Sequence, residues 1–174
     1  LSKNNQNIRR IDLITSIVSQ SKILIPYRQP IQHSYSLLSQ HKKFIEDAKK
    51  DKFISKYMYW IGHTEFGPNY IPIYIQKTNF NNDLEINHWI EQWYLTYSNA
   101  LNSLKNKQNI HFVSYEKLCA SRDYWFHIQE IAKIEELYDF EFKESKKSVP
   151  LNVDKELKEK SLSLYSELNE LNLN

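Results

Sequence analysis

Apolar residues recur at helical spacing over most of the chain. In the clearest case they stand three or four positions apart from residue 86 to residue 104, so they share one face of a helix. These residues are Ile86, Trp89, Ile90, Trp93, Tyr97, Ala100, Leu101 and Leu104. We expect this helix to pack its aromatic stripe into the core and not to serve as a stacking platform for sugars or bases.

Shorter apolar stripes predict further helices over residues 8–18, 30–45, 53–60, 122–137 and 154–171. In the first of these the stripe consists of Ile8, Ile11, Ile14 and either Ile17 or Val18. In the second it consists of Ile31, Tyr35, Leu38, Lys42 and Ile45, and Pro30 stands where a first helical turn tolerates its missing N–H. Residues 61–83 contain Gly62, Gly67, Pro68 and Pro72, so we expect an irregular segment there.

Two short runs break the helical pattern. Residues 22–28 (KILIPYR) are nearly all apolar and rich in β-branched side chains, which is typical of a central parallel strand covered on both faces. Residues 110–115 (IHFVSY) form a second such run. Helices alternating with these strands predict an α/β fold, rich in helix, with a short parallel sheet flanked by helices, and argue against a helical bundle.

Composition limits the class of protein. With 174 residues, the chain fits a single domain over 1–174, and its formal charge of +2 gives no support for nucleic acid as a partner. A lone Cys119 cannot form an internal disulfide framework or a thiol metal site. No apolar run reaches the roughly 20 residues of a membrane span, and no signal-peptide pattern is present. We expect a soluble, cytoplasmic protein.

One segment carries the chemistry. Arg28 ends the first predicted strand, and Ser36 follows eight positions later in the next helix. An arginine fork donates two charge-assisted hydrogen bonds to a phosphate, a serine hydroxyl adds a neutral donor, and a helix start adds peptide N–H groups. The alternative is that Arg28 forms a surface ion pair and that Ser36 is a solvated helix position.

The pattern Arg28-x-Pro30 with Ser36 resembles the 3′-phosphate-binding motif of sulfotransferases that use 3′-phosphoadenylyl sulfate. Further segments, in the same order, are similar to a bacterial family of these enzymes; they are residues 2–5, 37–41, 57–67, 89–97 and 113–119. The resemblance implies a P-loop-like, three-layer fold. It also implies transfer of a sulfuryl group to a hydroxyl or amine of a small molecule, glycan or other acceptor. In such an enzyme Arg28 and Ser36 would hold the donor's 3′-phosphate, and no metal ion would be needed.

The chain departs from that family in one respect. Sulfotransferases wrap the phosphosulfate end of the donor in a glycine-containing loop after their first strand, and here no glycine precedes Gly62. Because the chain also begins at Leu1, we expect it to be the C-terminal portion of a larger sulfotransferase domain, inactive alone. Lys3 and the pair Lys146 and Lys147 are basic residues that could lie near the donor, with solvated surface lysines as the alternative.

No catalytic base is assigned. The pair His63 and Glu65 belongs to the loop expected to form part of the acceptor pocket, but ordinary hydrogen bonding within the loop is the favoured explanation for it. Zinc-dependent chemistry would need a cysteine pair that the chain lacks. Two other functions stay open: a non-catalytic binding or interaction domain that keeps the fold without its donor loop, and a P-loop kinase, which would need a Gly-x-x-x-x-Gly-Lys loop. The acceptor's identity and the oligomeric state are not predicted.

Overall fold

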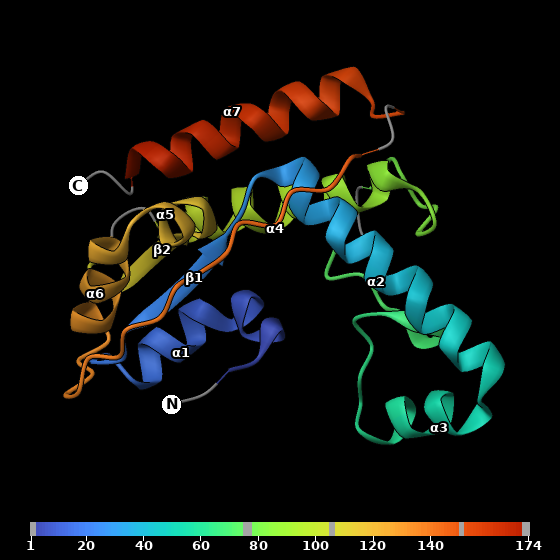
Figure 1. The fold of residues 1–174 in the computed structure, drawn as a ribbon, viewed down its shortest axis with the longest axis horizontal. Helices are drawn as coiled ribbons and strands as arrows, with labels where there is room; N and C mark the ends of the chain where they lie inside the picture. The colour runs from blue at the N-terminus through green and yellow to red at the C-terminus, as the bar shows by residue number, and fades with distance from the viewer. Residues whose placement is uncertain (1–2, 75–77, 105–106, 150–151, 172–174) are drawn as a thin grey trace. The chain divides into compact units, whose positions relative to one another are not determined.

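The computed structural model describes residues 3–74, 78–104, 107–149 and 152–171. Helices dominate it, with one short sheet between them (Figure 1). In chain order the elements are η1 (Asn5–Arg10), α1 (Ile11–Ile17), β1 (Ile23–Tyr27), α2 (Pro30–Lys50), α3 (Lys52–Trp60), η2 (Gly67–Asn69), α4 (Ile86–Leu104), β2 (Ile110–Ser114), α5 (Tyr115–Ala120), α6 (Arg122–Ile131) and α7 (Lys155–Leu171). The predicted helix-rich α/β class is therefore confirmed.

The sheet of the described residues consists of β1 and β2, which run parallel and side by side (Figure 1). Their register pairs Ile23 with Ile110 at one end and Tyr27 with Ser114 at the other. The prediction that both faces of β1 are covered was wrong, because burial alternates along the strand: Ile25 and Tyr27 are buried, whereas Leu24 and Pro26 are exposed. A continuous apolar run does not reveal by itself whether one face or two are covered.

Cα packing divides the chain into two compact units. Unit 1 comprises residues 1–29, 97–148 and 162–174, and unit 2 comprises residues 30–96 and 149–161, so the division falls inside α4 and inside α7. Each unit is described by itself below. The expectation of a single domain over 1–174 stays a prediction.

The core of unit 1 is built around Tyr27, the last residue of β1, which is only 1% exposed. Three rings meet it edge to face, with centroids 5.9 to 6.5 Å away: Tyr97, Phe112 and Tyr165. The Tyr97 hydroxyl, itself buried, donates a hydrogen bond of 2.7 Å to the carbonyl of Pro26. Aromatic packing and this one hydrogen bond therefore fasten the end of β1 to α4.

The core of unit 2 forms where α2 and the first half of α4 supply buried side chains. Its fully packed members are Leu38, Ile86, Trp89, Ile90 and Leu157. The predicted α4 stripe is confirmed for every member except Leu104, whose side chain lies outside the described residues. On α2 the buried residues are Pro30, Ser34, Leu38 and His41, so the predicted stripe was displaced by about one position. Apolar periodicity missed it because two of the buried side chains are polar.

The ends of the chain's other helices differ in part from the predictions. The segment expected to be one helix over 8–18 is a 3₁₀ turn followed by α1, and within its predicted stripe Ile11 is buried whereas Ile17 is 72% exposed. The helix expected over 122–137 ends at Ile131, and Lys133 adopts a φ of 56° just beyond it, as at many helix ends. The helices over 53–60 and 154–171 are confirmed. In the described part of the chain, no helix has the length and apolar character that crossing a bilayer requires.

We predict that Tyr97→Phe destabilises the protein by about 0.5–1.5 kcal/mol, because it removes the donor of the part-buried hydrogen bond to the Pro26 carbonyl while keeping the ring. Urea unfolding followed by circular dichroism would measure the change. Tyr59→Phe is the matched control, since that tyrosine is 72% exposed and should leave the midpoint unchanged. Equal midpoints for the Tyr97 variant and the unchanged protein would contradict this account of β1.

Candidate functional site

Arg28 lies directly beyond the end of β1, in unit 1, and its side chain is half-buried. Its guanidinium stacks over the ring of Tyr115, with Cζ 4.6 Å from the ring centroid. One of its N–H groups donates to the carbonyl of Ser145. The stacked arrangement is typical of a cation–π contact, and it fixes the plane of the guanidinium without occupying the N–H groups at its edge.

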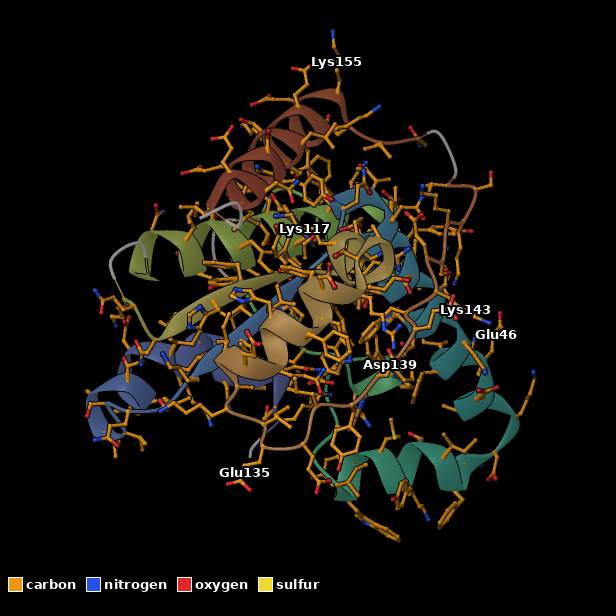
Figure 2. All side chains as sticks on the ribbon, turned by 60° about the vertical axis from the view of Figure 1, so that its left-hand side comes forward. Glu46, Lys117, Glu135, Asp139, Lys143 and Lys155 are labelled. Carbon is orange, nitrogen blue, oxygen red and sulfur yellow. The ribbon has the colours of Figure 1, made fainter. Side chains whose placement is uncertain are left out.

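Tyr115 also binds the segment that passes over it. Its hydroxyl donates to the carbonyl of Lys143 and accepts from the N–H of Ser145, both at 3.0 Å. The same tyrosine thus holds the arginine on its ring face and the backbone of 143–145 at its hydroxyl. The segment that leads into the predicted pair Lys146 and Lys147 is thereby brought to Arg28, and its Lys143 is exposed (Figure 2). Lys146 lies 3.0 Å from Glu144, which offsets part of its charge.

The turn after β1 is fixed by Glu116, which was not among the predicted site residues. Its Oε1 accepts a hydrogen bond of 2.9 Å from the backbone N–H of Gln29. Glu116 occupies the first turn of α5, which begins as soon as β2 ends. Burial raises the pKa of Tyr165 to about 12, with a smaller contribution from the Glu116 carboxylate. A carboxylate therefore lies close to the arginine's turn, although its recorded hydrogen bond goes to the backbone.

Ser36 lies in the second turn of α2, in unit 2, and is half-buried. Within the part of the chain that the structure describes, its hydroxyl has no recorded hydrogen-bond partner. Ser39, one turn later, differs because its hydroxyl donates to the carbonyl of Tyr35 at 2.7 Å. Arg28 and Ser36 belong to different units, so their meeting at one phosphate stays a prediction.

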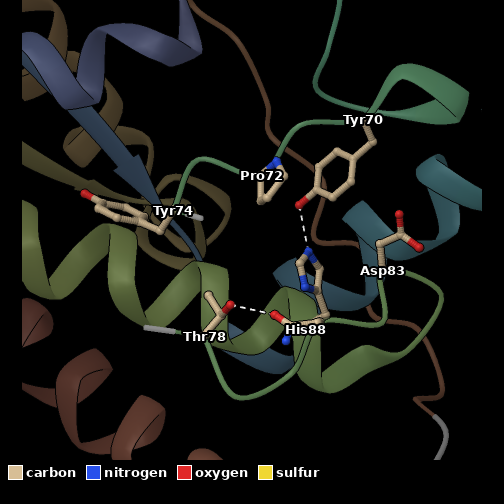
Figure 3. Close-up of a pocket in the computed structure, with 7 residues that line it drawn as sticks. Tyr70, Pro72, Tyr74, Thr78, Asp83 and His88 are labelled. Atoms are coloured by element: carbon tan, nitrogen blue, oxygen red, sulfur yellow. Dashed lines mark hydrogen bonds between the residues drawn. The ribbon is translucent and has the colours of Figure 1, made fainter. Parts of the chain in front are cut away.

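Unit 2 contains a pocket of ≈ 170 Å³ between the segment after η2 and the start of α4 (Figure 3). Its lining residues are Tyr70, Pro72, Tyr74, Thr78, Asn81, Asp83 and His88. His88 Nδ1 lies 2.8 Å from the Phe80 carbonyl, which can only accept, so in the neutral ring Nε2 accepts from the Tyr70 hydroxyl at 2.8 Å. Burial is the main reason why the pKa of Tyr70 is raised, and the Asp83 charge adds to it.

Two buried side chains of α4 form hydrogen bonds to the backbone of the segment beside this pocket. The Glu91 carboxylate, 5% exposed, accepts three hydrogen bonds of 2.9 to 3.1 Å from the backbone N–H groups of Asn79 and Phe80. The Gln92 amide both accepts from the N–H of Tyr74 and donates to its carbonyl. Neither residue was among the predicted candidates, since the predictions for this helix rested on its apolar stripe alone. The irregular segment is thus fixed by side chains that replace the backbone bonds of a strand.

His41, fully buried on α2, anchors the other end of the same segment. Its Nδ1 accepts from the N–H of Gly67 at 3.1 Å, and its Nε2 lies 3.6 Å from Asp83, beyond hydrogen-bond range. Gly67 has a φ of 82°, and a Cβ there would come within 3.2 Å of the Phe44 Cβ, so the position requires glycine. Gly67 is one of only two glycines in the chain, and this scarcity was the feature of the sequence that could have pointed to its position.

The remaining predicted candidates lie apart from any cluster of catalytic groups. His63 and Glu65 approach each other at 3.6 Å in the loop after α3, while the His63 ring stacks on Phe44. Lys3 precedes η1 and is exposed. Over the described residues, no three His, Cys, Asp or Glu side chains are grouped so that they could hold a metal ion.

Comparison with known proteins adds no relative. No protein-family model matches the chain, and neither the curated proteins nor the solved structures give a match. The resemblance to sulfotransferases therefore rests on the motif and the segments of the sequence named above.

We predict that His41 makes stability depend on pH. Burial is the main cause of its pKa lying below the usual 6.5; the Asp83 charge opposes the shift, while His88 and Lys42 add to it. Because the unfolded chain then binds the proton more readily, this contribution is complete above pH 6.5 and is lost as pH falls below it, by up to about 1.4 kcal/mol per pH unit.

Urea unfolding between pH 5 and pH 8 would measure this slope. His41→Asn, whose side-chain oxygen can still accept from Gly67, should flatten it. The matched control is His127→Asn, at a histidine that is 63% exposed. A slope that persists unchanged in the His41 variant would contradict the assignment.

Proposed function

We propose that the protein transfers a sulfuryl group from 3′-phosphoadenylyl sulfate to a hydroxyl or amine acceptor, and that Arg28 and Ser36 hold the donor's 3′-phosphate. The observation that carries this proposal is the position of Arg28, a stacked guanidinium at the carboxyl end of a parallel strand. Ligands of open α/β sheets gather at that edge. A P-loop-like, three-layer arrangement and a cytoplasmic location, with no nucleic-acid partner, belong to the same proposal.

The surroundings of Arg28 suit an anion. A guanidinium has five N–H donors, and the recorded contact with the Ser145 carbonyl takes a minority of them. The exposed lysines of segment 143–147 add positive potential, part of which is offset by the Glu144 carboxylate, 3.0 Å from the Lys146 ammonium. The Glu116 carboxylate, beside the turn that follows Arg28, uses one oxygen to accept a hydrogen bond from the backbone N–H of Gln29. A phosphate would receive a bidentate pair from the arginine's edge, the strongest form of such a contact.

Ser36 would contribute a neutral donor. It is the seventh residue of a helix of 21 residues, so it lies one turn beyond the first turn, whose free N–H groups and dipole favour negative charge. Its hydroxyl is half-buried and has no recorded partner in the described chain, in contrast to Ser39. A hydroxyl so placed can turn toward a ligand without breaking an existing hydrogen bond.

In the proposed reaction the bond between sulfur and the bridging phosphate oxygen breaks, and sulfur forms a bond to the acceptor's oxygen or nitrogen. The acceptor's proton passes to a base, which we do not assign. Arg28 and Ser36 act at the far end of the donor, so their part is to position it. For the acceptor we propose the pocket of Tyr70, Asp83 and His88, whose aromatic wall and single carboxylate suit a small polar molecule.

A second candidate is a non-catalytic binding domain that retains the nucleotide grip. It is favoured by the lack of any glycine before Gly62, because the residues ahead of β1 then include none that allows the close backbone approach to a phosphosulfate that such loops use. Both candidates bind adenosine 3′,5′-bisphosphate. They differ in turnover, since the intact protein is expected to transfer radiolabelled sulfate to an acceptor only if it is the enzyme.

We predict that Arg28→Ala weakens binding of adenosine 3′,5′-bisphosphate by about 1.5–3 kcal/mol, the usual loss for hydrogen bonds to a charged group. Isothermal titration calorimetry would measure it. Arg122→Ala is the control: this arginine is exposed and pairs with Asp139, so the variant loses the same charge away from Arg28's neighbours. An affinity that Arg28→Ala leaves unchanged would remove the basis of the proposal.

Ser36→Ala should weaken the same binding by about 0.5–1.5 kcal/mol, because a neutral hydrogen bond is lost. Ser39→Ala, on the same helix, is the control and should have no effect on affinity. If the two side chains grip one phosphate, the double variant of Arg28 and Ser36 will show a coupling of about 0.5 kcal/mol or more in a double-mutant cycle. Strictly additive losses would show that they act at separate places.

A further inference from the structure

Helix α3 is the element of unit 2 whose apolar residues are the least covered. It has no buried residue, and Phe53, Tyr57 and Trp60 are 59%, 49% and 69% exposed. They stand at i, i+4 and i+7, so they share one face of the helix, and Ile61 extends it at 54% exposure. We call Phe53, Tyr57, Trp60 and Ile61 the α3 aromatic face.

The face is continuous and is not turned toward the body of unit 2. The Phe53 and Tyr57 rings stack with centroids 6.0 Å apart, so they form one apolar surface. Ile54 and Met58, whose positions lie on another side of the helix, are the half-buried ones. The helix therefore docks through one side and leaves its larger aromatic side exposed. Contiguous apolar surface of this kind usually marks an interaction site.

Lysines surround the face. Lys52 and Lys56 are exposed on α3 itself, and Lys49 and Lys50 end α2 just before it. Residues 42–61 contain six lysines against three carboxylates, a larger positive excess than the +2 of the whole chain. Among those carboxylates Asp51 accepts from the N–H of Phe53 at 2.8 Å as the N-cap, and Glu46 lies on α2 (Figure 2). The aromatic face is thus bordered by cations.

We propose that the α3 aromatic face docks on a membrane surface containing anionic lipids. Tryptophan and tyrosine rings settle at the level of lipid headgroups, and lysines extend along apolar surface to reach the phosphates. An anionic leaflet attracts a basic segment that has collected such charge. The nine residues of α3 suffice to lie in the interface and not to cross it.

Charge separates this occupant from its rivals. A second copy of the chain would bring the same lysines to the contact, so the two faces would repel each other. An uncharged apolar peptide would cover the rings and gain nothing from the lysines. An anionic lipid surface is complementary to both parts of the patch. This inference goes beyond the proposed transfer reaction and does not depend on it.

Flotation with lipid vesicles tests the proposal directly. We expect the protein to float with vesicles of phosphatidylcholine mixed with phosphatidylserine, and much less with phosphatidylcholine alone. Replacing Phe53, Tyr57 and Trp60 by serine should lower this partitioning at least about tenfold. The matched control replaces Leu13, Ile17 and Val18 by serine, since these are apolar and 59%, 72% and 52% exposed in unit 1; it should float as the unchanged protein does.

Charge-reversal variants keep the test decisive if the serine variant folds poorly. Lys52→Glu with Lys56→Glu should reduce binding to the anionic vesicles about tenfold or more. Lys155→Glu with Lys158→Glu, on α7, changes the charge equally and should leave binding intact (Figure 2). The tryptophan emission of the unchanged protein should shift to the blue on adding anionic vesicles, and Trp60→Phe should abolish that shift.

Three results would overturn the proposal. The first is failure to float with anionic vesicles, and the second is flotation that the charge variants of α3 leave unchanged. The third is self-association in analytical ultracentrifugation that disappears in the serine variant of α3, which would assign the face to a second copy of the chain.

Discussion

The parallel pairing of β1 with β2 is the constraint on which the candidate site depends. Two parallel strands in register bring the residues that follow them to the same edge of the sheet. Because Tyr27 pairs with Ser114, their successors Arg28 and Tyr115 become neighbours although 87 positions separate them in the chain. The guanidinium then finds an aromatic ring to lie on, and that ring's hydroxyl holds the backbone of the basic segment. A single register thus assembles three separate pieces of sequence.

Side-chain hydrogen bonds hold the irregular part of unit 2 in place. Its backbone lacks the ladder of a strand, and buried side chains of two helices take over those hydrogen bonds. Glu91 and Gln92 reach the segment from α4, and His41 reaches it from α2. Each of these buried side chains has a backbone hydrogen-bond partner, which is the arrangement that makes such burial tolerable, although the second ring nitrogen of His41, Nε2, is buried without one. These hydrogen bonds fix the backbone of the irregular segment that forms one side of the pocket.

The helices and strands could be predicted from the sequence because their periodicity is a local property. The stripe of α4 and the short β-branched runs of β1 and β2 needed no knowledge of the rest of the chain. Long-range contacts could not be predicted from such local patterns. Nothing local distinguishes His41 from a solvated histidine, or Glu91 from an exposed carboxylate, and the burial of Ser34 displaced the expected stripe of α2.

The candidate site was predictable to a similar extent. Arg28 and Ser36 could be singled out from spacing, and the place of Arg28 after a strand agrees with that reasoning. Tyr115 could have been found by asking which residue follows the second strand, since parallel strands end together. Glu116 could not, because its role is to accept a hydrogen bond from a backbone group of a distant turn.

The register that joins Tyr27 to Ser114 also sets the electrical character of the site. Were β2 displaced by one residue, the neighbour of Arg28 would be either a small hydroxyl or the acid of Glu116, in place of an aromatic ring. In the second case the carboxylate would neutralise the arginine, and the sheet edge would no longer attract an anion. The charge at this edge of the sheet therefore depends on the register of β1 and β2. The buried Tyr27, packed among three rings, holds that register.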